Sequence, residues 1–286
     1  SSYQYAEMLS GQGFYEFLAQ QRAQLDADPA AMDTLTAKLQ EISGHILHRD
    51  NLVVMAAAPA DTLDGFCALA GEKLGALPSL PKAQAAYAFP QYPDQFAVAT
   101  EGSTTTTAAV LDAKKLENLS GTLFPFLYAL ENQYLVPTIR FQGLAYSAGI
   151  LVSSQLDQLS VYSYSDPNPA ASVAAIAQIP DVLAELELTR EELDGYILSA
   201  YSLVTRPTGK LERMMMAMQY TLSGFDTGLQ QRLAGEMLEA TPADREAAVE
   251  TMRTLWEDMR LVTVGNAALI QAAAEAYDAV YDYRQG

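Results

Sequence analysis

The sequence is poor in cysteine, histidine and basic residues, and each shortage excludes a class of protein. One cysteine, Cys67, among 286 residues excludes an internal disulfide framework and a cysteine-rich zinc site. Seventeen lysines and arginines against 35 acidic residues leave a net charge of −18, which argues against a nucleic acid as partner. The same charge disfavours binding to an anionic membrane surface, and it is compatible with basic or neutral peptides.

Long apolar runs are also missing. No run approaches the ~20 apolar residues that a membrane-spanning helix needs. The sequence has no basic, apolar leader at Ser1, and this feature together with the single cysteine favours a reducing cytoplasm. Half of the residues are nevertheless apolar, so the chain has enough material for a sizeable core without disulfides or metals.

Most strand signals lie early in the chain, and one more follows near its end. Short β-branched or apolar runs predict strands at residues 52–55, 95–100 and 261–264. Alternating apolar and polar residues over 143–152 and 159–165 predict a β-hairpin. Helical patterns dominate the later part of the chain, and this order favours an α+β fold over an alternating parallel one.

Helix signals include two capping boxes. Thr189 with Glu192 predicts one helix start, and residues 241–244 predict another. A leucine-rich and aromatic stretch predicts a helix from Lys114 to about Tyr134, and apolar spacing after Gly265 predicts a last helix that runs through Tyr281.

The two ends of the chain share an order of helix, short strand, helix. This repetition suggests a duplicated domain of roughly two hundred residues. We therefore expect residues 1–80 to be the tail of a preceding, similar domain, with a proline-punctuated linker at 77–82. Residues 84–286 are expected to form a complete two-layer α+β domain, with a mainly antiparallel sheet covered by helices.

Two sets of residues could carry metal or thiol chemistry. His45 and His48 are three residues apart, a spacing that places two rings on one side of a helix where zinc could bind. A catalytic zinc needs three protein ligands and a base, however, so the sequence favours two surface histidines near a helix end. Cys67 lies within an apolar helical pattern and is interpreted as a small core residue.

Arg140 and Tyr146 form the most informative pair. The arginine follows a helix, the tyrosine lies on the next strand, and Gly143 allows a sharp turn between them. A guanidinium and a phenol brought together can donate hydrogen bonds to a carbonyl oxygen, or to the oxyanion that develops from it. The alternative is a structural arginine paired with a carboxylate and a half-buried strand tyrosine.

The region from about 134 to 168 resembles a known family. The matching residues are Tyr134-Leu135, Ile139-Arg140, Gln142-Gly143, Ala145-Tyr146 and the segment 162–168, which reads Tyr-Ser-Tyr-Ser-Asp-Pro-Asn. In this order they resemble the C-terminal half of pitrilysin/insulinase-type zinc metallopeptidases, and the presequence-protease branch is the most similar. That branch has glycine where this chain has Leu144 and Ser147, which affects how closely a peptide backbone can approach.

The resemblance implies a fold and a function. Such enzymes close two halves like a clamshell around an unfolded peptide, and each half holds two similar α+β domains. The N-terminal half holds Zn²⁺ through His-x-x-Glu-His, a motif that this sequence lacks, so this chain would not ligate the metal. The C-terminal half supplies an arginine and a tyrosine, here Arg140 and Tyr146, which bind the substrate backbone near the scissile bond.

We therefore expect the end of the third domain and all of the fourth domain of a peptide-degrading zinc metallopeptidase, inactive alone. Its partners would be the N-terminal catalytic half and a peptide substrate, with basic peptides favoured by the charge. One alternative is a noncatalytic partner or structural subunit of such a peptidase complex. Another is a peptide-binding module without an enzymatic partner.

Overall fold

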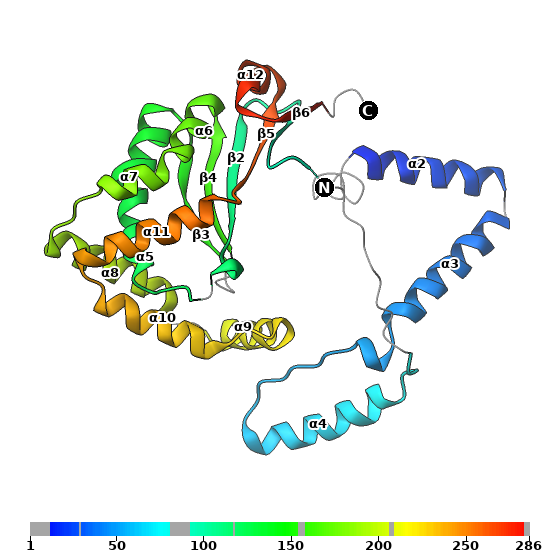
Figure 1. Ribbon diagram of the computed structural model, residues 1–286. Helices are drawn as coiled ribbons and strands as arrows, with labels where there is room; N and C mark the ends of the chain where they lie inside the picture. Colours follow the sequence, from blue (N-terminus) through cyan, green and yellow to red (C-terminus); the bar gives the residue numbers. More distant parts are fainter. Residues whose placement is uncertain are drawn as a thin grey trace. The chain divides into compact units, whose positions relative to one another are not determined.

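The computed structural model describes residues 12–28, 30–80, 92–116, 118–153, 158–205 and 209–282. The chain divides into two compact units, residues 1–91 and 92–286 (Figure 1). The expected linker at 77–82 lies partly outside the described residues.

The first unit consists of helices and connecting segments. Its elements are α2 (Gln12–Ala27), α3 (Ala30–Ile46), η1 (Arg49–Asn51) and α4 (Ala60–Gly75). None of the described residues of α3 and α4 is buried within the chain. The strand expected at 52–55 is wrong: the stretch belongs to no strand or helix. A strand needs a neighbour for its ladder hydrogen bonds, and the described part of this unit contains no strand.

The second unit is built on a six-stranded sheet of order β3-β4-β2-β5-β1-β6. Three of its strand contacts are antiparallel, and β1 lies parallel to both β5 and β6. The α+β class with a mainly antiparallel sheet is therefore confirmed. The strands are β1 (Gln95–Thr100), β2 (Thr105–Asp112), β3 (Ser147–Val152), β4 (Gln158–Asp166), β5 (Arg260–Asn266) and β6 (Ala279–Asp282).

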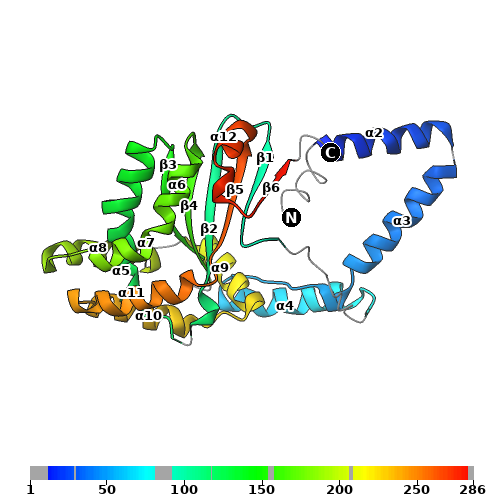
Figure 2. The same cartoon turned by 45° about the horizontal axis from the view of Figure 1, so that its top comes forward.

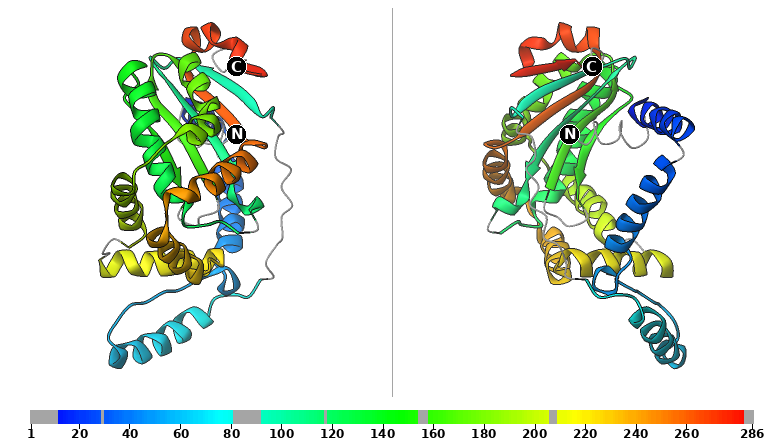
Figure 3. Two further views of the ribbon diagram at one scale, coloured as in Figure 1. Left: turned by 60° about the vertical axis from the view of Figure 1, so that its left-hand side comes forward. Right: turned by 90° about the vertical axis from the view of Figure 1, so that its right-hand side faces the viewer.

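Helices cover one face of this sheet. Burial alternates along β2, where Thr105, Thr107, Ala109 and Leu111 are buried and the residues between them are more accessible. In Figures 1 and 2, α5, α6 and α7 lie together on one side of the strands, and Figure 3 shows the strands from two further directions. Among the described residues, no helix has the length and apolarity that crossing a membrane would require.

The helical elements of this unit are η2 (Ala113–Lys115), α5 (Leu123–Leu130), η3 (Glu131–Gln142), α6 (Pro169–Ala177), α7 (Ile179–Glu185), α8 (Arg190–Thr205), α9 (Lys210–Ser223), α10 (Thr227–Glu239), η4 (Pro242–Asp244), α11 (Arg245–Trp256), α12 (Ala267–Ala272) and η5 (Ala274–Ala276). Both capping boxes form. The N–H and hydroxyl of Thr189 donate to Glu192, and those of Thr241 donate to Asp244.

Two helix predictions need correction. The helix expected from Lys114 starts at Leu123, because 105–112 form a strand whose end turns into a short 3₁₀ helix. The helix expected through Tyr281 ends at Ala272, and residues 279–282 instead form β6. This last segment pairs with β1, so a contact with a distant strand replaces the local helical preference.

Candidate functional site

The predicted arginine lies on an unusual helix. Helix η3 is a π-helix of 12 residues that continues from α5 and contains Pro137. Its end shows the wider winding directly, because the N–H of Gly143 donates to the carbonyl of Thr138, five residues earlier, at 2.9 Å. Leu135 and Ile139 are buried and fix the helix to the core. Arg140, next to the buried Ile139, is exposed to solvent.

A tight turn links this helix to β3. Gly143 is required there by close approach, since a Cβ at this position would lie 2.6 Å from the carbonyl oxygen of Ile139. Leu144 follows with φ of 65°, in the left-handed region that favours glycine. The N–H of Ala145 then donates to Ile139 O at 3.2 Å. The backbone thus joins the residue before Arg140 to the residue before Tyr146.

Tyr146 is held by the end of β4. Its N–H donates to the carbonyls of Tyr164 at 3.0 Å and Ser165 at 3.3 Å. The rings of Tyr146 and Tyr164 meet edge to face, with centroids 6.3 Å apart and an interplanar angle of 78°. The predicted hairpin is confirmed, with β3 and β4 antiparallel and Ser147 opposite Tyr164.

A buried carboxylate organises this end of β4. Asp166 is fully buried, and it accepts hydrogen bonds from the Ser163 hydroxyl at 2.8 Å and from the Asn168 N–H at 2.7 Å. Between them, Ser165 adopts a positive φ of 49°. The Asp-Pro-Asn sequence therefore bends the chain from β4 into α6, and it fixes the two carbonyls that bind Tyr146.

A second carboxylate ties the start of η3 to β3. Glu131 accepts a hydrogen bond from the Ile150 N–H at 2.7 Å, a group that the ladder with β4 does not use. Gly149 leaves room for this contact, since a Cβ there would lie 3.0 Å from Glu131 Oε2. Burial raises the pKa of Glu131, and the hydrogen bond from Ile150 opposes the increase. Helix η3 is thus attached to β3 near both of its ends.

Both predicted site residues are accessible. Tyr146 is 71% exposed, so the half-buried alternative does not apply to it. Arg140 Cζ lies 5.5 Å from the centroid of the Phe141 ring. Within the described parts of the chain, no carboxylate forms an ion pair with Arg140, so the structural ion pair considered for it is not found there. In a chain of net charge −18, this guanidinium remains available to an incoming acceptor.

The two histidines do not form a pair on one helix. Helix α3 ends at Ile46, so His45 is exposed on its last turn, whereas His48 is extended and buried. The surface interpretation is therefore wrong for His48. Residues 78–80 bond to Arg49 and Asp50 beside it, which explains its burial. Among the described residues, no three His, Cys, Asp or Glu side chains gather in a way that could hold a metal.

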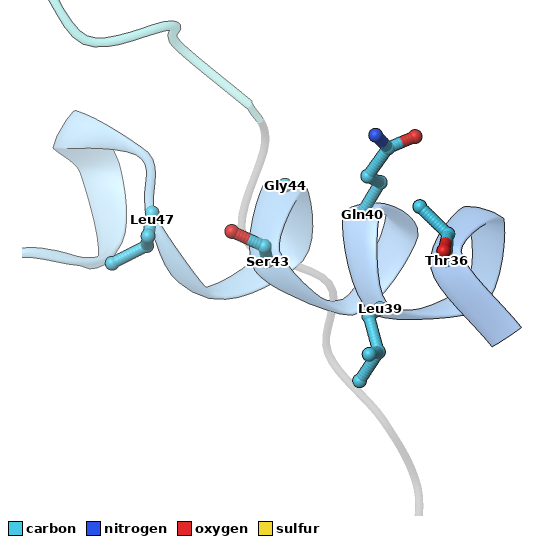
Figure 4. A pocket seen from close by; sticks show the side chains of 6 residues that line it. All are labelled: Thr36, Leu39, Gln40, Ser43, Gly44 and Leu47. Carbon is cyan, nitrogen blue, oxygen red and sulfur yellow. The ribbon is translucent and has the colours of Figure 1, made fainter.

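Cys67 is exposed on α4, so its interpretation as a core residue is wrong. The apolar pattern of α4 predicted burial, but the helix buries none of its described residues within this chain. The stretch 52–55 likewise has no partner strand in the described part of its unit. A surface pocket in the same unit lies along α3 and offers no ionisable side chain (Figure 4). Its lining residues are Thr36, Leu39, Gln40, Ser43, Gly44 and Leu47.

Sequence reasoning missed two residues, one next to Arg140 and one at the start of η3. Phe141 contacts the guanidinium of Arg140, and its position next to the arginine was the available signal. Glu131 gave no signal, because its contact with Ile150 depends on how η3 packs against β3.

Comparison with known proteins identifies the fold. No family model and no curated protein matches the sequence. A solved protein named as a predicted insulinase family protease of Yersinia pestis matches with a TM-score of 0.50 and 15% identity, over 76% of this chain and 53% of that one. The chain has an insulinase-type peptidase fold. The resemblance drawn from residues 134–168 is confirmed at the level of the fold.

Two further solved structures are similar to this chain. The first half of the periplasmic protease PqqL from Escherichia coli has a TM-score of 0.47 and 14% identity, over 73% of this chain and 50% of that one. A peptidase M16 inactive domain from Pseudomonas fluorescens has a TM-score of 0.46 and 16% identity, over 72% and 51%. The chain spans about half the length of each of the three structures.

Proposed function

We propose that this chain is the C-terminal, substrate-handling part of an insulinase-type zinc metalloendopeptidase that degrades unfolded peptides. In this proposal residues 1–80 are the tail of a third domain and residues 84–286 are the fourth domain. The insulinase-type fold supports it. So does the absence of His-x-x-Glu-His from a sequence with only two histidines. A separate N-terminal half would hold the zinc ion, which supplies an activated water when bound.

The accessible, adjoining positions of Arg140 and Tyr146 carry the proposal. The Ile139–Ala145 hydrogen bond brings their backbones together, and the Asp166 bend holds the carbonyls that bind Tyr146. The guanidinium and the phenol both donate hydrogen bonds, so both can bind the carbonyl oxygen of a peptide. As that oxygen gains negative charge during hydrolysis, each hydrogen bond becomes stronger, and this difference accelerates the reaction.

Replacement of Tyr146 by phenylalanine tests the role of the phenol. We expect turnover of the enzyme assembled with its zinc-bearing half to fall roughly 10- to 100-fold, the order of magnitude for the loss of one oxyanion donor at an accessible site. The thermal midpoint should not change, because the ring and its contact with Tyr164 remain. Tyr220→Phe is the matched control, since the Tyr220 ring on α9 also contacts another aromatic ring, that of Phe225. Wild-type turnover in Tyr146→Phe would contradict the catalytic role.

The same variants distinguish the alternatives. If the chain is a structural subunit, Tyr146→Phe and Arg140→Gln leave the activity of the assembled complex unchanged. If it is a peptide-binding module, both variants weaken peptide binding and no zinc-dependent cleavage accompanies it. A preference for basic peptides is expected to decline as salt is raised, because ions screen exposed charges beyond about 8 Å at physiological ionic strength.

A further inference from the structure

A row of buried hydroxyl groups crosses the middle of the sheet on its helix-covered face. Ser163 of β4, Thr107 of β2 and Thr263 of β5 are register partners on three neighbouring strands, and all three are fully buried. We call these three residues the hydroxyl row. The hydroxyls of Thr107 and Thr263 share a hydrogen bond of 2.8 Å. The Ser163 hydroxyl donates to the buried Asp166, so the row ends at the carboxylate that organises the bend after β4.

Tyr277 brings a further hydroxyl to this region from near the end of the chain. Its ring belongs to the core, and its buried hydroxyl forms no hydrogen bond of good geometry with any residue that the structure describes. Burial raises the pKa of Tyr277, the hydroxyl of Thr263 opposes the increase, and the charge of Asp166 adds to it. Thr263 and Asp166 are therefore both close enough to act on the phenol.

The backbone around Tyr277 is attached to the sheet. Its N–H donates to the carbonyl of Ala274 at 3.2 Å. The next residue, Asp278, donates its N–H to Gln95 O at 2.8 Å and accepts a hydrogen bond from the Gln95 N–H at 3.2 Å. These bonds tie the segment between η5 and β6 to the start of β1. The Tyr277 ring therefore enters the core from a fixed position.

The energetics of buried hydroxyls indicate the partner of Tyr277. A buried phenol without an acceptor destabilises a fold, whereas a phenol that donates to a carboxylate stabilises it. Asp166 has spare capacity, because an ionised carboxylate offers about four lone-pair positions and each of its oxygens accepts one described hydrogen bond. If Thr107 donates to Thr263, Thr263 to Tyr277 and Tyr277 to Asp166, every one of these donors is satisfied. Hydrogen bonds that run in one direction also strengthen one another.

We propose that the Tyr277 hydroxyl completes a hydrogen-bond chain from Thr107 and Thr263 to Asp166, and that Tyr277 is thereby a positioning residue for Tyr146. This inference rests on the proposed function, because Tyr146 is the group that is positioned. Tyr277 acts through Asp166, whose bend fixes the two carbonyls that accept the Tyr146 N–H. The end of the chain thus supports the proposed site from inside the core.

Tyr277→Phe tests the proposal in the 286-residue chain, since it removes one oxygen and keeps the ring. We expect hydrogen exchange at the Tyr146 amide to become about tenfold faster relative to exchange at the amide of the buried Leu193 on α8, which reports global unfolding. Thr263→Val removes the preceding hydroxyl and should raise the same ratio by a smaller factor. Tyr220→Phe on α9 is the matched control and should leave the ratio unchanged.

Two further readouts separate positioning from a purely structural role. In a chain that already carries Asp166→Asn, adding Tyr277→Phe should accelerate exchange at Tyr146 far less, because the acceptor of the phenol has been weakened. In the enzyme assembled with its zinc-bearing half, Tyr277→Phe should lower kcat severalfold with little change in KM, since the hydrogen bond from Tyr146 strengthens only as the oxyanion develops.

The other outcomes distinguish this inference from the proposed function. An unchanged exchange ratio in Tyr277→Phe, or a thermal midpoint above that of the wild type, would show that the hydroxyl has no acceptor. Either result overturns the inference and leaves the proposed function intact. Faster exchange at Tyr146 together with wild-type kcat would instead support the hydrogen-bond chain and contradict the proposed role of Tyr146 in turnover.

Discussion

The carbonyl oxygen of Ile139 accepts a hydrogen bond from the N–H of Ala145, although six residues separate them. Because Arg140 and Tyr146 each follow one of these residues, the same bond sets the spacing of the two proposed donors. Gly143 lies inside the loop that the bond closes, and its α-hydrogen faces the same carbonyl.

Replacement of Gly143 by alanine is expected to disturb this loop. The new Cβ would lie 2.6 Å from Ile139 O, so the backbone must shift. We expect a loss of about 1–3 kcal/mol in the free energy of unfolding, measured with urea, together with weaker peptide binding. Gly195→Ala on α8 is the control, because nothing lies within 4 Å of its added Cβ. Helix propensity predicts that this control gains about 0.5–1 kcal/mol. Equal stabilities of the two variants would contradict the close approach.

Replacement of Leu144 by glycine is expected to be tolerated or stabilising. Relief of the left-handed backbone gains about 1–2 kcal/mol, and the greater freedom of glycine in the unfolded chain removes about 0.5–1 kcal/mol. The net gain should therefore lie between zero and about 1.5 kcal/mol in urea unfolding. Leu211→Gly, at a comparably exposed leucine on α9, should instead lose about 1 kcal/mol. A Leu144→Gly variant that loses as much as this control would show that φ at Leu144 carries no strain.

Replacement of Asp166 by asparagine should loosen the end of β4. An amide offers one oxygen where the carboxylate accepts hydrogen bonds on two, so either Ser163 or Asn168 loses its acceptor. We expect a loss of about 1–3 kcal/mol and faster hydrogen exchange at the Tyr146 amide.

Asp244→Asn provides the comparison for this variant. It weakens the exposed capping box at the start of η4, with a loss of about 1 kcal/mol. Exchange at Tyr146 should not change in this control beyond its effect on global stability. Unaltered exchange at Tyr146 in Asp166→Asn would show that the bend does not hold the tyrosine.

Replacement of Glu131 by glutamine should alter how stability depends on pH. Since burial raises the pKa of Glu131 above its usual 4.5, the folded chain holds this proton more tightly than the unfolded chain does. Its contribution to stability is present below that usual value and is lost as pH rises through the raised pKa. The free energy of unfolding, measured with urea, should decline as pH rises across this window in the wild type. The decline should be smaller in Glu131→Gln.

Glu192 provides a control of opposite sign. Hydrogen bonds from the N–H and hydroxyl of Thr189 lower its pKa, so its contribution is present above the usual 4.5 and is lost as pH falls. Glu192→Gln should therefore reduce the loss of stability on the acidic side. If the free energy of unfolding depended on pH equally in the wild type and in Glu131→Gln, the role assigned to the burial of Glu131 would be contradicted.

Local patterns predicted the elements that depend on neighbouring residues. The hairpin of β3 and β4 and the capping boxes at Thr189 and Thr241 are of this kind. The turn between Arg140 and Tyr146 is of this kind too, since Gly143 stands between them and the Ile139–Ala145 hydrogen bond closes a loop of only a few residues.

Long-range contacts decided the elements that were predicted wrongly. Residues 279–282 form a strand because they meet β1, some 180 residues earlier in the chain. Residues 52–55 have strand composition, but no partner strand lies in the described part of their unit. The burial of His48 likewise depends on residues 78–80, and no periodicity in the sequence reports such a contact.

The π-helical winding of η3 makes the direction of Arg140 depend on chain length. Successive residues of an α-helix are offset by about 100° around the axis, and those of the wider π-helix by somewhat less, so one residue more or fewer turns everything beyond it by roughly a quarter turn. Removing a residue between Glu131 and Leu135 would place the buried side of the helix and Arg140 out of phase with β3. Insertions and deletions within this segment are therefore expected to be far more damaging than substitutions at its exposed positions.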